Sequence, residues 1–288
     1  MKVLISGSNG FLGSAFVKFL KKKNIPHLVY DRNNPEKLSF DFDSVVNFGG
    51  LTPNSDIKNG VFTPEEYRIA NVEGTKLFLE NIVKNKKLKR FINIGTAAEC
   101  GFSVLPISEG FEEKPIGPYG ESKLVQSKLV RKFAEENKIK VINLRLFNVA
   151  GLPNRIRSRG VVASNPFIFE SLVDQFVLNF NGQIFINNEN DIRDYVDIED
   201  IMEAIFLALK TENGGQYEII NICSGMGTKL ADVVSLFGKV LNKEYKIRAV
   251  SGGDKNCSQS VGVSDKAKKI LNWEPNTNLE ESIKKMTW

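Results

Sequence analysis

The sequence predicts an α/β fold, a doubly wound parallel sheet with a smaller mixed α/β lobe. Short apolar runs rich in Val and Ile alternate with longer amphipathic segments through the first half of the chain, as in βαβ units. A glycine-rich turn directly follows the first apolar run, and the alternation loosens after residue 150. The chain has 288 residues, of which 42% are hydrophobic and 25% charged, which is enough to bury such a core.

The strands of the sheet should be short and continuously apolar, because helices cover both faces of a parallel sheet. They are predicted at 2–6, 27–30, 44–48, 90–94, 140–146 and 217–223. Amphipathic periodicity predicts helices at 11–23, 64–86 and 118–137, and further helices near 166–180, 198–210, 228–241 and 278–286. We expect residues 1–150 to form the sheet domain, to which 196–223 return, and 151–195 with 224–288 to form the smaller lobe.

The composition argues against several classes of function. His27 is the only histidine, so we expect no multi-histidine metal centre and no Ser-His or Cys-His nucleophile. Three cysteines without paired spacing suit reduced thiols in a cytoplasm. The first residues do not resemble a secretory signal, and the absence of a long apolar run argues against a membrane span. The net charge of +5 is spread over scattered lysines without interleaved aromatics, so nucleic-acid binding is not expected.

The turn after the first strand has the pattern of a dinucleotide site in a Rossmann-type fold. Its glycines would permit a tight turn, close approach of a pyrophosphate, and packing of helix on strand. The residues of this GSNGFLG turn expected at the cofactor are Gly7, Gly10, Phe11, Leu12 and Gly13. A turn without a ligand is the alternative, but Asp31 ends the second strand where a carboxylate can bind the adenosine ribose. We favour NAD because of Asp31 and keep NADP open, because Arg32 could pair with a 2′-phosphate.

The segment GPYGESKLV places Tyr119 and Lys123 one helical turn apart, on the same face of the predicted helix. Two polar residues on a wet helix face are the simpler interpretation. Thr96, however, ends the strand INIGT at the edge where ligands of such folds bind. An adjacent ammonium and a positively charged nicotinamide would favour the phenolate of Tyr119 and lower its pKa. Tyr119 is therefore a candidate acid and base for a carbonyl or an alcohol.

At these motifs the sequence resembles the extended short-chain dehydrogenase/reductases that act on nucleotide-diphosphate sugars. The resemblance covers almost the whole chain in consistent order. It rests on GSNGFLG, VVNFGGLT (45–52), ANVEGTKLFLENI (70–82), INIGTAAECG (92–101), YGESK, LRLFNVAG (144–151), IRDYVDIEDI (192–201) and SDKAKKILNWEP (264–275). It implies a homodimer formed through the helices at 64–86 and 118–137.

The resemblance also implies roles for individual residues. Thr96 would hold the reacting sugar oxygen, Tyr119 would exchange its proton, and Lys123 would hold the nicotinamide ribose. Phe48 and Gly49 would border the cofactor, and Asn71 would lie near the active site. Asn148 and Arg193 match positions that contact the diphosphate and nucleotide of the substrate. An ion pair of Arg193 with a neighbouring carboxylate, such as Asp194 or Asp197, is the structural alternative.

Departures from the family pattern narrow the reaction. Ala97 and Ala98 stand where sugar-nucleotide 4,6-dehydratases have Asp-Glu, and Ala98 also replaces the cysteine of the epimerase-reductases that make GDP-fucose. Methyl groups move no protons, so dehydration and epimerisation at carbons 3 and 5 are disfavoured. Cys100 takes a place usually held by tyrosine in the family. Between Asp31 and Asp43 the chain lacks the strand whose Asp-Leu or Asp-Ile pair reaches the adenine of the cofactor, and Asp41-Phe42 could take over that role.

Three functions stay open. The sequence favours a 4-ketoreductase of a nucleotide-linked 4-keto-6-deoxyhexose, because the chain is compact and lacks extra acid-base groups beside Thr96. An NAD-dependent 4-epimerase of a nucleotide-diphosphate sugar is the alternative, slightly favoured by Asp31. A non-catalytic sensor of nicotinamide nucleotides is remote, because it would have no need of Thr96, Tyr119 and Lys123 together.

Overall fold

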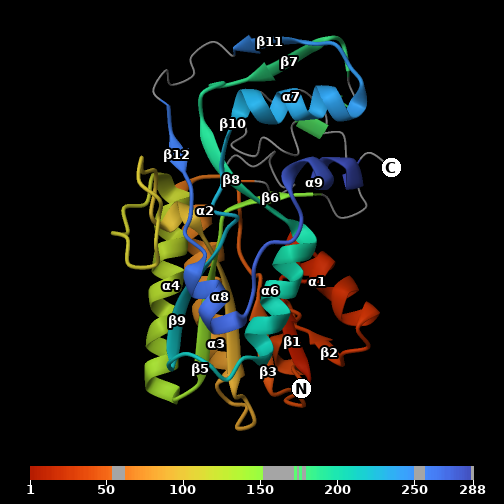
Figure 1. The fold of residues 1–288 in the computed structure, drawn as a ribbon. Coiled ribbons are helices and arrows are strands. Elements are labelled where there is room, and N and C mark those ends of the chain that lie inside the picture. The colour runs from red at the N-terminus through yellow and green to blue at the C-terminus, as the bar shows by residue number, and fades with distance from the viewer. Residues whose placement is uncertain (54–61, 152–171, 174, 177–179, 250–256, 287–288) are drawn as a thin grey trace.

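A computed structural model describes residues 1–53, 62–151, 172–173, 175–176, 180–249 and 257–286. Within this part of the chain the main sheet has six parallel strands in the order β2-β1-β3-β4-β5-β9 (Figure 1). The strands are β1 (Val3–Ser6), β2 (His27–Val29), β3 (Ser44–Asn47), β4 (Arg90–Thr96), β5 (Lys140–Leu146) and β9 (Tyr217–Ile222). The chain first places β2 on one side of β1 and then crosses to place β3 on the other side. Doubly wound folds bind ligands in the crevice that forms where the strand order reverses in this way.

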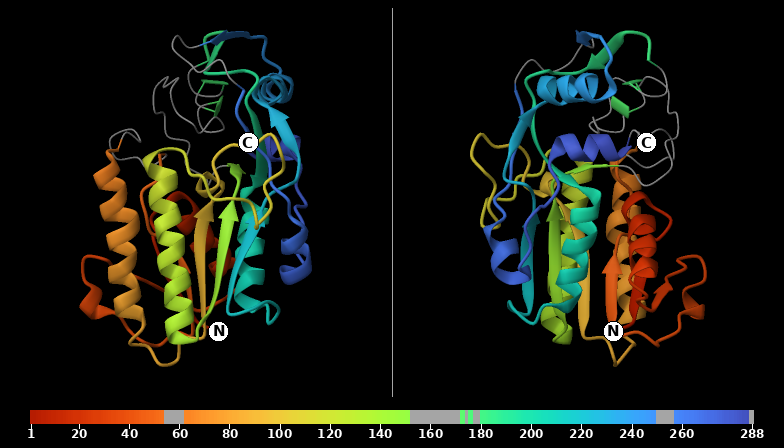
Figure 2. Two further views of the ribbon diagram at one scale, coloured as in Figure 1. Left: turned by 90° about the vertical axis from the view of Figure 1, so that its left-hand side faces the viewer. Right: turned by 45° about the vertical axis from the view of Figure 1, so that its right-hand side comes forward.

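Helices cover both faces of this sheet (Figure 2), which confirms the predicted fold class. On one face, α1 (Phe11–Lys22), α6 (Ile198–Lys210) and α8 (Asp265–Leu271) enclose a core that includes Val3 and Ile5. On the other, α3 (Gly74–Ile82) and α4 (Gly117–Asn137) enclose a core that includes Leu4. Neighbouring residues of β1 therefore point into opposite cores, which explains why this strand is apolar at successive positions.

The smaller lobe lies beyond the carboxyl ends of the strands (Figure 1). Its centre is β8 (Ile192–Asp197), which pairs with β6 (Asn148–Ala150), β10 (Gly227–Lys229) and β12 (Gln259–Ser260). A second pair joins β7 (Gln183–Ile186) to β11 (Lys246–Ala249). The apolar faces of α7 (Leu230–Leu241) and α9 (Leu279–Met286) pack in a core with residues of β7.

The carboxylate of Asp194 joins three segments of this lobe. It lies on β8, is fully buried, and accepts hydrogen bonds from Ser224 N (2.7 Å), Ser224 Oγ (2.6 Å), Gly225 N (2.9 Å) and Gly262 N (3.2 Å). These donors come from the turn after β9 and the segment after β12. Burial raises the pKa of Asp194 even though the bonds oppose the rise.

The predicted helix at 64–86 differs from the structure. The segment divides into α2 (Pro64–Tyr67), a π-helical stretch η3 (Arg68–Glu73) and α3. The side chain of Asn71 is fully buried in the π stretch and bonds to Leu51 N at 2.6 Å, Leu51 O at 3.1 Å and Ser122 Oγ at 2.8 Å. The π turn thus aims a polar side chain into the protein.

Three further expectations concern the segment between Asp31 and Asp43, the helix near 166–180 and membrane-spanning helices. Between Asp31 and Asp43 the structure has a single 3₁₀ turn, η1 (Pro35–Lys37). Asp41 pairs with Lys2 at 2.7 Å, while Phe42 is buried in the core beside α3. The predicted helix at 166–180 lies mostly outside the described residues. No helix in the described ranges is both long and apolar enough to cross a membrane.

Candidate active site

The glycine turn is shaped by close backbone approach. Gly7 has φ +67°, and a Cβ there would lie 2.7 Å from Phe48 C and 2.8 Å from Gly49 N. A Cβ on Gly13 would lie 2.2 Å from Gly7 O, whereas one on Gly10 would meet only Gly7 O, at 3.3 Å. Gly7 and Gly13 therefore allow the turn to pack on β3 and on α1. Gly10 leaves open space instead.

The same turn begins α1 at Phe11, followed by Leu12. The N-cap residue is Gly10, which has no side chain to cap the helix, and the first turn carries no acidic residue. The first backbone N–H groups of α1 and the positive end of its dipole are thus available to an anion. These features fit the pyrophosphate of a dinucleotide cofactor.

Asp31 and Arg32 follow β2, which pairs in parallel with β1, so they lie beside the glycine turn. Both side chains are exposed. Asp31 accepts hydrogen bonds from Asn33 N (2.9 Å) and Asn34 Nδ2 (2.7 Å), and these bonds lower its pKa. The group is a carboxylate at neutral pH, as an acceptor for ribose hydroxyls requires.

Thr96 and Tyr119 meet at the carboxyl end of β4. Thr96 is the last residue of the strand, and Tyr119 lies in the first turn of α4, which packs against β4. The Thr96 side chain is near enough to the phenol to affect its pKa. The Tyr119 ring lies 5.7 Å from the ring of Tyr67, between centroids. Burial raises the pKa of Tyr119, and only the polar side chain of Thr96 opposes the rise.

Lys123 lies one turn along α4, and only 7% of the residue is exposed. Its Nζ donates to Ile94 O at 2.7 Å and to Gln126 Oε1. Burial lowers its pKa to about 8. In the chain alone, burial dominates and the pKa of Tyr119 is raised. The lowered pKa expected from the sequence includes the positive charge of a bound nicotinamide and stays a prediction.

Gln126 connects this lysine to the other expected cofactor residues. Its Nε2 donates to Thr75 Oγ1 at 2.8 Å, Asn71 O at 3.2 Å and Gly49 O at 3.3 Å. Phe48, before Gly49, packs its ring against Phe16 of α1 with centroids 5.6 Å apart. The segment after β3, the π turn at Asn71 and α4 therefore form one connected wall.

Asn148 and Arg193 belong to the lobe. Asn148 begins β6 and pairs in register with Tyr195 of β8. The guanidinium of Arg193 donates to Ser258 O (2.7 Å), Ser258 Oγ (2.8 Å) and Ile192 O (2.9 Å). Its ion pair, at 3.6 Å, is with Asp191, not with Asp194 or Asp197. It also lies 4.8 Å from the centroid of Phe102, a ring that is half exposed.

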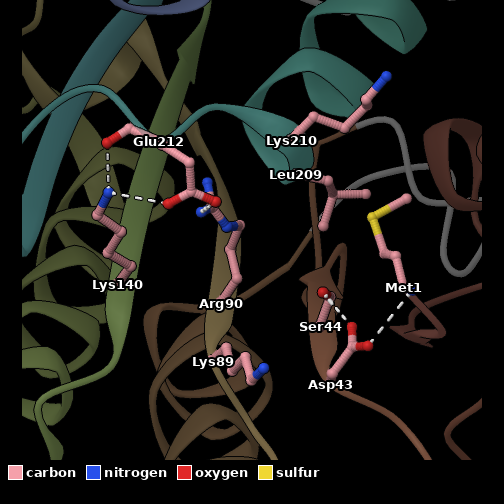
Figure 3. A pocket seen from close by; sticks show the side chains of 9 residues that line it. All are labelled: Met1, Asp43, Ser44, Lys89, Arg90, Lys140, Leu209, Lys210 and Glu212. Atoms are coloured by element: carbon pink, nitrogen blue, oxygen red, sulfur yellow. Dashed lines mark hydrogen bonds and ion pairs between the residues drawn. The ribbon is translucent and has the colours of Figure 1, made fainter.

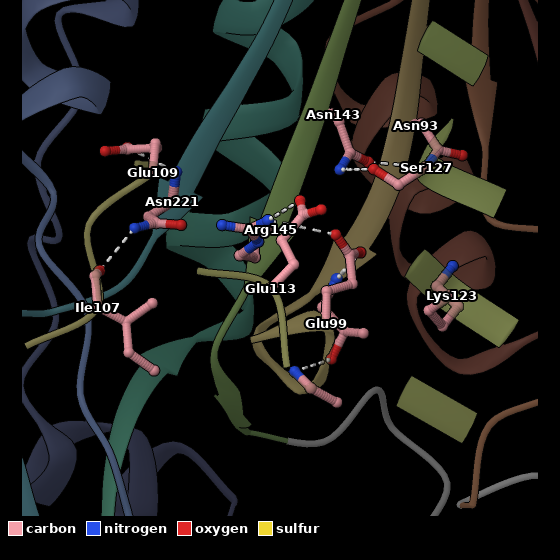
Figure 4. Close-up of polar contacts among 12 residues, drawn as sticks. Asn93, Glu99, Ile107, Glu109, Glu113, Lys123, Ser127, Asn143, Arg145 and Asn221 are labelled. Carbon is pink, nitrogen blue, oxygen red and sulfur yellow. Dashed lines mark hydrogen bonds and ion pairs between the residues drawn. The ribbon is translucent and has the colours of Figure 1, made fainter. Parts of the chain in front are cut away.

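Sequence reasoning missed the buried partners of this site. Gln126 was not singled out, nor were Glu99 and Arg145, which form a buried ion pair (Figure 4). One signal was present, because an arginine in the otherwise apolar run KVINLRL implies a buried acidic partner.

A pocket of about 450 Å³ lies at the opposite, amino-terminal edge of the sheet (Figure 3). Arg90 on its wall donates to Ala208 O at 3.1 Å and pairs with Glu212 at 3.1 Å. Its cations therefore serve internal contacts at the edge away from Thr96 and Tyr119. In the described ranges, no three His, Cys, Asp or Glu side chains cluster so as to hold a metal ion.

Comparisons with known proteins agree with this arrangement. The model of the NAD dependent epimerase/dehydratase family matches residues 3–223. A UDP-glucose 4-epimerase of Halalkalibacterium halodurans is 27% identical, with 100% of this chain and 95% of the relative covered. The solved UDP-glucose 4-epimerase of Thermotoga maritima with UDP-glucose is 25% identical, with a TM-score of 0.81 and coverage of 100% and 97%. RMD of Pseudomonas aeruginosa, complexed with NADPH, is 20% identical, with a TM-score of 0.82 and coverage of 99% and 97%.

Proposed function

Since this chain belongs to the NAD dependent epimerase/dehydratase family, we propose that it is an NAD-dependent 4-epimerase of a nucleotide-diphosphate sugar. It is an enzyme of the extended short-chain dehydrogenase/reductase type. The observation that carries the proposal is the close pair of Thr96 and Tyr119, with buried Lys123 one turn along the same helix, at the carboxyl end of β4. Similarity to UDP-glucose 4-epimerases along the whole chain supports it.

The side chains define a path for one proton. Thr96 and Tyr119 can both bond to the oxygen on carbon 4 of the sugar, with Tyr119 taking its proton and later returning it. NAD, when bound, would supply the hydride acceptor and donor for the same carbon. Burial keeps the phenol protonated in the chain alone. Its ionisation therefore requires extra positive charge, which Lys123, one turn along α4, and the nicotinamide of bound NAD would supply.

The cofactor would lie over the glycine turn. Gly7, Gly10 and Gly13 would hold the pyrophosphate, with Phe11 and Leu12 at the helix N-terminus. We favour NAD, because the carboxylate of Asp31 would repel the 2′-phosphate of NADP. Arg32 would attract that phosphate and is the argument for NADP. Arg193 would have to exchange bonds with Ser258 for bonds to a diphosphate, and Asn148 would lie near the same group.

A 4-ketoreductase of a nucleotide-linked 4-keto-6-deoxyhexose is the second candidate. Two observations favour it: Ala97 and Ala98 offer no further acid or base beside Thr96, and the chain is compact. The alignment of this chain with the Halalkalibacterium epimerase extends over 320 positions, more than the 288 residues of the chain, so the chain is the shorter of the two. Such an enzyme would use Thr96 and Tyr119 to bind and protonate the ketone oxygen.

Turnover separates the two candidates. The purified enzyme would be incubated with UDP-glucose or UDP-galactose and NAD, and the products followed by chromatography, while absorbance at 340 nm reports net oxidation or reduction. An epimerase interconverts the sugars without net change at 340 nm. Stoichiometric oxidation of NADH or NADPH by a nucleotide-linked 4-keto sugar, without interconversion, would instead establish the reductase.

We also propose a homodimer formed through α3, α4 and the π stretch η3. Among their exposed side chains are the apolar Ile69 (53% exposed), Leu77 (48%) and Val125 (43%). Burying them in a helical interface would remove apolar surface from water. One chain has a mass of 32.2 kDa, and light scattering should give twice this mass. The variant Leu77→Glu should give the mass of the monomer.

A further inference from the structure

A buried cluster of charges, drawn in Figure 4, is in contact with the backbone of Thr96. It contains Glu99, in the 3₁₀ turn η4 (Ala97–Glu99), Arg145 on β5, and Glu113 from the loop before α4. Arg145 Nη2 lies 3.6 Å from Glu99 Oε2 and 3.1 Å from Glu113 Oε1. The side chains of Glu99 and Arg145 are 0% exposed, and that of Glu113 is 30% exposed. The proposed reaction does not use these groups.

Glu99 determines how Thr96 is held. Its Oε1 accepts the backbone N–H of Thr96 at 2.9 Å, and Thr96 Oγ1 accepts the N–H of Ala98 at 3.3 Å. Gly95 leaves room for this contact, since a Cβ there would lie 2.7 Å from Glu99 Oε1. Because Oγ1 accepts from Ala98, its own proton can point towards Tyr119. The carboxylate at position 99 thus fixes the backbone of Thr96, from which the hydroxyl is presented to Tyr119.

Counted together with Lys123, the charges of the cluster balance only when Glu99 is ionised. Burial raises the pKa of Glu99, while Arg145, the N–H of Thr96 and Lys123 oppose the rise. A neutral Glu99 would leave a buried guanidinium and a buried ammonium facing one partly exposed carboxylate, which is costly. The titratable groups that face Glu99 or Tyr119 are Lys123 on α4, Tyr67 on α2, Cys100 after η4, Arg145 on β5, Glu113 in the loop and Tyr217 on β9.

We propose that Glu99 is a positioning residue, whose carboxylate orients the Thr96 hydroxyl and places a fixed negative charge behind Tyr119 and Lys123. It is not itself a proton donor to substrate, because its side chain is buried and its oxygens face Thr96 N and Arg145. The proposal rests on the proposed function for the role of Tyr119. Its effect on Lys123 does not depend on which sugar is turned over.

The first test titrates Lys123 in the cofactor-free enzyme. The ¹³Cε signal of Lys123, assigned with Lys123→Arg, would be followed against pH in the wild type and in Glu99→Gln. The negative charge of Glu99 favours the ammonium, so its removal should lower the midpoint by about one pH unit. The matched control is Glu113→Gln, which removes a carboxylate from the same Arg145 atom without touching Thr96. An unchanged midpoint in Glu99→Gln, or an equal shift in Glu113→Gln, would overturn the proposal.

The second test separates positioning from packing. Glu99→Gln should move the acidic limb of the pH profile of kcat to lower pH by about one unit, because Tyr119 ionises more easily without the charge. The KM for the nucleotide sugar should stay near the wild-type value. A profile that does not move while Lys123 shifts would refute the effect on Tyr119. A lack of turnover in the wild type would refute the proposed function and leave the Lys123 result intact.

A double variant covers the case in which Glu99→Gln does not fold. Glu99→Leu with Arg145→Met removes both buried charges, and such replacements are often neutral or stabilising. The proposal predicts a folded enzyme with an unchanged KM and a kcat lower by about tenfold or more, because Thr96 N–H has lost its acceptor. A folded double variant with wild-type kcat would reduce Glu99 to a packing residue.

Discussion

Replacing Gly13 by alanine is expected to disrupt the dinucleotide turn from within. The added Cβ would lie 2.2 Å from Gly7 O, more than 1 Å inside the 3.4 Å where ordinary contact begins, and also 2.9 Å from Gly7 C and 3.0 Å from Ser8 Cα. All three atoms are backbone, so no side chain can move aside. Overpacking of this kind costs about 3 kcal/mol, or about 5 to 10 °C in Tm.

Two other glycines make the prediction specific. Gly10→Ala brings its Cβ to 3.3 Å from Gly7 O and otherwise into open space, so Tm should stay near the wild type while NAD affinity falls. Gly74→Ala, in α3, comes no closer than 3.6 Å to Ile69 O and should stabilise the helix by up to about 1 kcal/mol. Thermal unfolding and calorimetric NAD titration of the three variants would decide. The reasoning is refuted if Gly13→Ala matches the wild type in Tm, or if Gly10→Ala binds NAD normally.

Three further predictions concern single side chains. Tyr119→Phe should lower kcat by at least about 10²-fold in the product assay while the chain stays folded, and a smaller loss would argue for a nucleotide sensor. Lys123 has a pKa of about 8 when folded against 10.5 ordinarily, so the unfolded chain binds more protons between these values, and the free energy of unfolding rises with pH. Urea unfolding of the wild type and of Lys123→Met at several pH values should show that the variant lacks this rise in the free energy of unfolding, which is on the order of 3 kcal/mol. Parallel plots of that free energy against pH would contradict the prediction. Asp194→Asn leaves one acceptor oxygen for four donors and should cost about 3 kcal/mol in urea unfolding, whereas an unchanged midpoint would show that the lobe does not depend on this carboxylate.

The sequence predicted the main sheet because each element there carries a complete local signal. The bounds of 140–146 and 198–210 agree with β5 and α6. β5 is buried along almost its whole length, with Ile142, Leu144 and Leu146 in one core, and α6 is capped at its start by Asp197, whose side chain accepts Glu199 N at 2.9 Å. The short strands of the lobe were not predicted, because two to four residues carry too little periodicity to be distinguished from loops.

The candidate site was predicted in its outline and missed in its interior. Thr96 and Tyr119 could be paired from the order of strands and helices, because parallel strands end at one edge. The partners of Lys123 depend on which way a buried side chain turns, which spacing alone does not specify. Arg193 shows the same limit: the structural alternative named Asp194 or Asp197 as examples of a partner, whereas the ion pair in the structure is with Asp191.

The position of β9 has a consequence for how the protein is made. It pairs with β5 along six residues, from Val141↔Tyr217 to Leu146↔Ile222, yet the whole intervening segment must leave the ribosome first. Until then a nascent chain presents the open edge of an apolar strand, the kind of edge that invites association with other chains. Slow translation of residues 147–216 would prolong that exposure. This interval is therefore where we expect a newly made chain to depend most on chaperones.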